Sequence, residues 1–141
     1  MKRLLFLCTG NSCRSQMAEG WMRQRWGQEF EVFSAGILAK GIDPRAARVM
    51  QESGVDLSQH SSKTLVSLGD EPFDYVVTVC GHADESCPTL PARTAKLHMP
   101  FDDPPKLTEG MGDDDALPIY RRVRDEIEAS VASLPERLSS L

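Results

Sequence analysis

The sequence predicts an α/β fold, namely a single doubly wound domain over residues 1–141 with a four-stranded parallel sheet flanked by helices. Three observations indicate this class. Short apolar runs alternate with longer segments of helix-forming residues. Glycine-containing turns separate many of these segments. The chain has 141 residues, of which 40% are hydrophobic, enough for one core. Strands that alternate with helices form parallel sheets with helices on both faces, so we expect that arrangement here.

Four segments have the character of strands. Residues 3–7, RLLFL, are apolar and precede a turn, which is typical of a central strand. Residues 30–36, FEVFSAG, alternate before the chain breaks at Gly36. Residues 74–79, DYVVTV, indicate a buried strand, and residues 95–99, AKLHM, give a weaker fourth signal.

The helical segments carry start and stop signals. Residues 15–27, SQMAEGWMRQRWG, contain helix formers and end at a glycine. Residues 43–54, DPRAARVMQESG, begin with Asp43 as N-cap and Pro44 at the first helical position, and Gly54 follows the end.

The C-terminal part combines a loop with a closing helix. Residues 100–118 are rich in Pro, Gly and Asp, which predicts a loop. In the segment 119–134, apolar residues recur every four positions, which predicts an amphipathic helix. These residues are Ile119, Val123, Ile127 and Val131.

Composition excludes several classes of function. The formal net charge of −5 argues against a nucleic-acid partner, which would require a basic face. No apolar run approaches the roughly 18–20 residues of a membrane span. The start, MKRLLFLCTG, has only Leu4 to Leu7 as its apolar run, short of the ~7–15 residues of a signal peptide. We therefore expect a cytoplasmic protein, in which four cysteines favour catalysis, redox chemistry or metal binding over structural disulfides.

The segment after the first strand, CTGNSCRS at residues 8–15, has the pattern Cys-x5-Arg between a strand and a helix. Gly10 and Asn11 tolerate positive φ, so successive N–H groups can turn inward around an anion. The helix N-terminus and the planar fork of Arg14 favour the same anion. This field is expected to lower the pKa of Cys8 and make it a nucleophilic thiolate. Alternatively, Cys8 is a small core residue at a strand end.

The whole loop is the candidate oxyanion-binding segment. Ser15 is placed to donate a hydrogen bond to the Cys8 sulfur, whereas Cys13 is expected to be a packing residue. The candidate set is Thr9, Gly10, Asn11, Ser12, Cys13, Arg14 and Ser15.

Two more cysteines follow the third strand, in VTVCGHADESCP at residues 77–88. Carboxyl ends of parallel strands meet at one edge, so Cys80 should emerge beside Cys8. Three interpretations of Cys80 and Cys87 are open. They have no role in the chemistry, they bind zinc together with His82, or they are redox partners of Cys8. Their spacing is not that of a usual zinc site, and we expect no metal. The turn-prone residues between them suit the movement that thiol–disulfide exchange needs.

The loop CTGNSCRSQMAEG resembles the phosphate-binding loop of the low-molecular-weight protein tyrosine phosphatase fold. It resembles more closely the thioredoxin-coupled arsenate reductases built on that fold. SAG at 34–36, VTVCGHADESCP, FDDP and RVRDEI at 122–127 extend the resemblance over nearly the whole chain. The resemblance implies a low-molecular-weight tyrosine phosphatase-like fold and the reduction of arsenate to arsenite in arsenic detoxification.

The same resemblance implies the roles of the cysteines and the partners. Cys8 would be the nucleophile, Cys80 and Cys87 would form a disulfide relay, and thioredoxin would recycle them. Phosphate and sulfate would compete with arsenate, weak phosphatase activity would remain, no cofactor would be bound, and the protein would be a monomer.

The segment FDDPP offers two candidate general acids. In the family the acid is an aspartate just before a proline, which implies Asp103, with Asp102 as the second candidate. Either aspartate could instead only cap a turn.

Some reductases of this family bind potassium near the loop. The positions that resemble this site are Asn11, Glu19, Ser34 and Lys63. The fourth position is acidic in the potassium-binding members, so the ammonium of Lys63 is expected to pair with Glu19 and to remove any potassium requirement. Alternatively, Lys63 is a simple exposed charge.

Two other functions compete with arsenate reduction. A phosphotyrosine phosphatase would share Cys8, Arg14 and Asp103 but would not need the downstream cysteines. It would also require aromatic walls, and aromatic residues make up only 6% of this chain. A non-enzymatic anion or redox sensor would not require the general acid.

Overall fold

A computed structural model describes residues 1–80 and 94–141. Its sheet has four parallel strands in the order β2-β1-β3-β4. Their bounds are Lys2–Cys8 for β1, Phe30–Gly36 for β2, Tyr75–Thr78 for β3 and Ala95–His98 for β4. The predicted four-stranded parallel sheet is therefore confirmed, with each strand within two residues of its expected bounds.

The register of the sheet fixes where the loops begin. Cys8 is paired with Gly36 on β2, and Leu7 is paired with Thr78 on β3. The N–H of Val79 continues the ladder to the carbonyl of Leu7 at 3.0 Å. The segments that leave β1, β2 and β3 therefore start side by side at one edge of the sheet.

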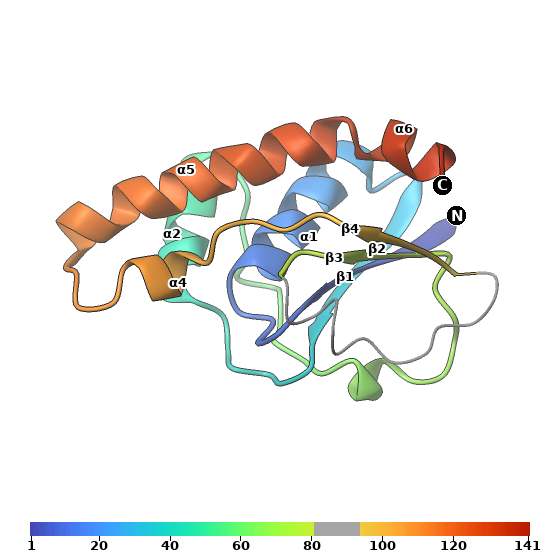
Figure 1. Ribbon diagram of the computed structural model, residues 1–141, viewed down its shortest axis with the longest axis horizontal. Helices are drawn as coiled ribbons and strands as arrows, with labels where there is room; N and C mark the ends of the chain where they lie inside the picture. Colours follow the sequence, from blue (N-terminus) through green and yellow to red (C-terminus); the bar gives the residue numbers. More distant parts are fainter. Residues whose placement is uncertain (81–93) are drawn as a thin grey trace.

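Helices cover the sheet and pack on one another (Figure 1). Helix α1 contacts β1, β2 and both α2 and α5, and α5 runs across the molecule over α1 and α2. The helices and the 3-10 turn η1 have these bounds: α1 Arg14–Trp26, α2 Pro44–Glu52, η1 Val66–Leu68, α4 Pro104–Leu107, α5 Asp113–Ala132 and α6 Leu134–Ser139. None of them, within the described residues, combines the length and the apolar character that a membrane crossing requires.

The capping prediction for α2 is confirmed. Asp43 is the N-cap and accepts a hydrogen bond from the Arg45 N–H at 2.9 Å, and Pro44 opens the helix. Gly54, just beyond the end, has φ +83°, which favours glycine. The Tyr120 hydroxyl donates to the second Asp43 oxygen at 2.6 Å, which ties α2 to α5.

The predicted loop 100–118 is wrong in part. Helix α4 begins at Pro104, because proline suits the first helical position and Asp103 precedes it as N-cap. Helix α5 begins at Asp113, six residues before the predicted start. Three aspartates in its first turn interact favourably with the helix dipole. Pro118, the sixth residue of α5, lacks the N–H that would bond to the Asp114 carbonyl, so the helix gives up one hydrogen bond there.

Candidate active site

The loop between β1 and α1 is shaped by one buried residue, Asn11. Its φ is 47°, in the left-handed region, and its side chain is fully buried. Its Nδ2 donates to Ser15 Oγ at 2.9 Å and to Ser34 Oγ at 3.0 Å. Its Oδ1 accepts from the Lys63 N–H at 2.9 Å and from Gln16 Nε2 at 3.0 Å. These bonds hold the backbone turn that the loop needs.

Gly10 does not play the predicted role. Only Asn11 adopts a positive φ in this loop; Gly10 does not. Gly10 lies against the Lys40 side chain instead: a Cβ there would come within 2.8 Å of the Lys40 Cδ, so the lysine would have to shift.

The four residues that resemble a potassium site lie together. Ser34, besides accepting from Asn11, donates to Glu19 Oε1 at 2.5 Å. The Lys63 ammonium lies 3.9 Å from the same carboxylate, as the sequence predicted. Glu19 is 3% exposed and also binds Arg23 Nε at 2.8 Å. Burial lowers the pKa of Lys63, and Glu19 opposes that shift.

Arg14 begins α1 and reaches toward the segment after β4. Its Nη1 donates to the Phe101 carbonyl at 3.0 Å, and its Nη2 lies 3.5 Å from Asp103 Oδ2. Its Nε is buried and has no partner among the described residues. Cys8, Arg14 and Asp103 line one hollow of about 270 Å³ at the carboxyl edge of the sheet. An arginine whose buried donor faces no protein acceptor suits a bound oxyanion.

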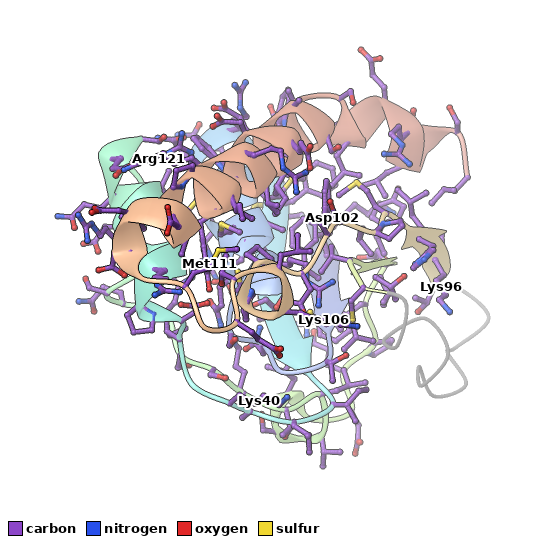
Figure 2. The ribbon with its side chains drawn as sticks, turned by 60° about the vertical axis from the view of Figure 1, so that its left-hand side comes forward. Lys40, Lys96, Asp102, Lys106, Met111 and Arg121 are labelled. Carbon is purple, nitrogen blue, oxygen red and sulfur yellow. The ribbon has the colours of Figure 1, made fainter. Side chains whose placement is uncertain are left out.

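The two candidate acids are separated by the fold. Asp103 lines the hollow, whereas Asp102 is exposed and accepts from Arg122 Nη2 of α5 at 3.0 Å. Figure 2 shows Asp102 beside the ribbon of α5. Only Asp103 is therefore placed where it could exchange a proton with a ligand of the hollow.

Cys80 lies beside Cys8, as predicted from the strand ends. Both are buried and neither forms a disulfide. Cys80 Sγ lies 3.2 Å from the hydroxyl of Thr9, the residue that follows Cys8. The expected low pKa of Cys8 is wrong for this arrangement. A hydrogen bond with Cys80 raises the pKa of Cys8, and burial adds to that shift, while Arg14 and the Thr9 N–H act in the opposite direction.

Of the remaining cysteines, the structure describes Cys13 but not Cys87. Cys13 is 4% exposed, and burial raises its pKa well above the usual value, with Asp43 adding to the shift. A buried, protonated thiol suits the predicted packing role. Cys87 and His82, by contrast, lie outside the described residues.

The chain segment after β2 forms an outer wall of the loop, which the sequence did not reveal. The Leu38 N–H donates to the Thr9 carbonyl, and the Lys40 N–H donates to the Gly10 carbonyl, both at 2.9 Å. The Asp43 N–H donates to the Ser12 carbonyl at 3.0 Å. Lys40 also lines the hollow. The only sequence feature that could have indicated Lys40 is its position just after a strand that ends at this edge.

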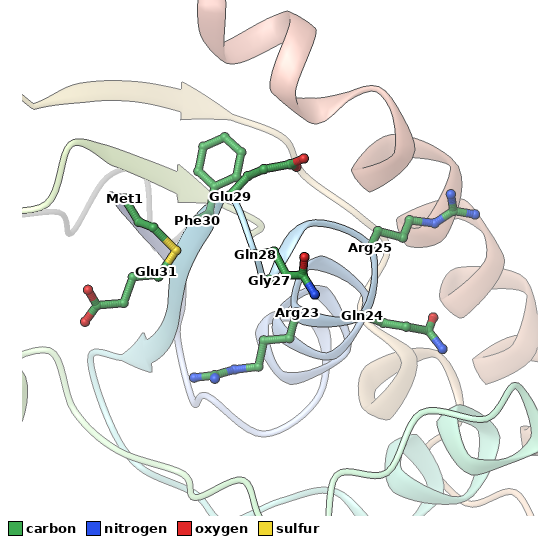
Figure 3. Close-up of a pocket in the computed structure, with 9 residues that line it drawn as sticks. All are labelled: Met1, Arg23, Gln24, Arg25, Gly27, Gln28, Glu29, Phe30 and Glu31. Atoms are coloured by element: carbon green, nitrogen blue, oxygen red, sulfur yellow. The ribbon is translucent and has the colours of Figure 1, made fainter.

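A larger hollow, of about 550 Å³, lies at the opposite edge, near the start of β1 and β2 (Figure 3). Its cations already have partners: Arg23 binds Glu19 and the Val32 carbonyl, and Arg25 Nη2 lies 3.5 Å from Glu128. It contains none of the predicted site residues.

Known proteins resemble both the sequence and the fold. An arsenate reductase from Halalkalibacterium halodurans is 47% identical over 135 residues, which are 96% of each chain. A solved structure described as an arsenate reductase in the phosphate-binding state is 28% identical, with a TM-score of 0.77, covering 98% of this chain and 99% of the other. A thioredoxin-dependent arsenate reductase from Corynebacterium glutamicum is 26% identical, with a TM-score of 0.69, covering 99% of this chain and 62% of the other.

A family model extends this relationship over almost the whole sequence. The model for low molecular weight phosphotyrosine protein phosphatases matches residues 3–140. The chain therefore belongs to the low molecular weight phosphotyrosine protein phosphatase family.

Proposed function

We propose that this protein reduces arsenate to arsenite through a relay of Cys8, Cys80 and Cys87, with thioredoxin as the electron donor. The observation that carries the proposal is the placement of a second cysteine, Cys80, against the nucleophile of an oxyanion loop. A hydrolase needs only one thiol at this position. The name of the 47% identical relative supports arsenate as substrate, and that of the Corynebacterium structure supports thioredoxin.

The first step forms a bond between sulfur and arsenic. Arsenate binds to the N–H groups of the loop and to Arg14, whose Nε is the unpartnered donor. The hydrogen bond between Cys80 and Cys8 breaks, the Cys8 thiol gives its proton to the bound arsenate dianion, and Arg14 and the Thr9 N–H then stabilise the Cys8 thiolate. The thiolate attacks arsenic, and Asp103 donates a proton to the departing oxygen, which leaves as water.

The second step transfers two electrons. The Cys80 thiolate attacks the Cys8 sulfur, a disulfide forms, and the electron pair of the sulfur–arsenic bond reduces arsenic(V) to arsenic(III). Arsenite leaves. Cys87 then attacks Cys80, which releases Cys8 as a thiolate and forms the Cys80–Cys87 disulfide that thioredoxin reduces.

Several further features belong to the same proposal. The protein acts as a cytoplasmic monomer of one domain, holds no resident cofactor, and uses neither nucleic acid nor membrane. Phosphate and sulfate compete with arsenate for the loop, because all three are tetrahedral oxyanions. Weak hydrolysis of aryl phosphates remains for the same reason.

The test is NADPH oxidation in a mixture of the protein, thioredoxin and thioredoxin reductase, with and without arsenate. The expected result is arsenate-dependent oxidation that is lost in Cys80→Ser and in Cys87→Ser. No oxidation, together with aryl phosphate hydrolysis that survives both substitutions, would indicate a phosphatase instead.

A further inference from the structure

The hollow at the carboxyl edge contains a second cation besides Arg14. Lys40 lies in the segment after β2 and lines the hollow opposite the start of α4 (Figure 2). Its backbone N–H donates to the Gly10 carbonyl at 2.9 Å. Its side-chain stem lies against Gly10, where an added Cβ would be 2.8 Å from Cδ and 3.1 Å from Cγ. The missing side chain at Gly10 therefore leaves room for the Lys40 stem on the oxyanion loop.

The two cations differ in how far their charges are already balanced. Arg14 lies 3.5 Å from Asp103 and donates to the Phe101 carbonyl. The Lys40 side chain is exposed and makes no ion pair within residues 1–80 and 94–141. Within the described residues, its charge is thus the one at the hollow that no carboxylate offsets.

A local cation matters because of the charge of the whole chain. The formal net charge is −5, so at long range the protein repels a dianion. An unbalanced ammonium at the hollow would reverse this repulsion near the loop and raise the local concentration of the anion.

We propose that Lys40 recruits a free inorganic tetrahedral dianion to the Cys8 loop. The inference rests on the proposed function for the identity of the dianion as arsenate. The residues that line the hollow include no aromatic side chain among those described, so a phenyl ring would find no apolar wall.

The experiment compares Lys40→Met, Lys40→Arg and Lys2→Met. Met keeps the stem over Gly10 and removes the charge, Arg keeps the charge, and Lys2 is an exposed lysine at the start of β1, at the opposite edge. For Lys40→Met we expect an arsenate KM raised about tenfold, a kcat within about twofold, and a weaker dependence of kcat/KM on salt concentration. Lys40→Arg and Lys2→Met should resemble the unsubstituted protein.

A second readout separates this inference from the proposed function. Calorimetric titration with inorganic phosphate measures oxyanion binding without turnover, and Lys40→Met should weaken it about tenfold. If the unsubstituted protein fails to reduce arsenate but Lys40→Met still binds phosphate more weakly than it does, the proposed function fails and the recruiting role stands. Unchanged KM and phosphate affinity in Lys40→Met, or an equal loss in Lys40→Arg, would overturn the role of the charge.

Discussion

Arg14 Nη2 lies 3.5 Å from Asp103 Oδ2, and this contact places one of two adjacent aspartates in the oxyanion hollow. Asp102 lies on the other side of the same backbone segment, 3.0 Å from Arg122 of α5. The side chains point apart because consecutive residues of an extended segment alternate in direction. Two residues with the same chemistry therefore have different surroundings, which makes them a matched pair for testing the general acid.

Asp103→Asn should lower the kcat for arsenate by about 10²- to 10⁴-fold, since an amide cannot donate the proton that the departing oxygen needs. Asp102→Asn removes the same charge from a residue that lies outside the hollow and should retain kcat within about twofold. Steady-state kinetics of both variants decides the assignment. Equal losses in the two variants would contradict it.

The contact between Cys80 and Cys8 predicts a pH effect. The hydrogen bond with Cys80 is the main cause that raises the pKa of Cys8. Cys80→Ala removes it, so the pKa of Cys8 should fall and its alkylation by iodoacetamide should reach half-maximal rate at a lower pH. Peptide mass spectrometry identifies the labelled residue.

The control for this shift is Cys13→Ala. Cys13 is buried in the same loop but is not among the groups that shift the pKa of Cys8. Its replacement should leave the alkylation midpoint of Cys8 in place. A midpoint that does not move in Cys80→Ala would show that burial alone holds the proton on Cys8.

Cys87→Ser should permit one turnover and no cycling. In the proposed relay, the Cys8–Cys80 disulfide forms without Cys87, but nothing then passes the oxidising equivalents to thioredoxin. A single-turnover assay should yield about one arsenite per protein molecule. Repeated turnover with thioredoxin as the sole reductant would contradict the relay.

Asn11→Ala should destabilise the protein by about 3 kcal/mol, because it leaves several buried polar partners without a hydrogen bond. Urea unfolding measures the change in the free energy of unfolding. Asn11→Gly serves as the control, since glycine accepts the φ of 47° without strain. If Asn11→Gly were as stable as the unsubstituted protein, the backbone and not the side-chain bonds would be the cause.

The parts of the fold that could be predicted are those with local signals. The apolar runs of β1 and β3 and the Asp43–Pro44 start of α2 depend on neighbouring residues only. The composition of segment 100–118 predicts a loop where two helices begin, because Pro and Asp favour both turns and helix starts. Only the packing of Ala116, Leu117 and Tyr120 against the core reveals that α5 begins early.

The features of the site also divide into those that the sequence could predict and those that it could not. Cys8 and Cys80 could be placed together because both follow strands of one parallel sheet. The pKa of Cys8 could not be predicted, since its sign depends on a contact between residues 72 positions apart. Lys40 was missed because it has no motif, and its contact with Gly10 arises only when the segment after β2 runs along the loop.

Potassium should not activate this protein. The Lys63 ammonium lies 3.9 Å from Glu19 Oε1, in the region that resembles a potassium site, and already supplies a positive charge there. Reductase activity should be the same in sodium chloride and potassium chloride of equal concentration. A strong rise in activity on replacing sodium with potassium would contradict this assignment.

Lys63→Met should cost about 1 kcal/mol of unfolding free energy, less than for a fully buried pair, because Glu19 retains Arg23 and Ser34 as partners. Lys106→Met, at an exposed position on α4, is the matched control in urea unfolding and should change stability by less than about 0.5 kcal/mol.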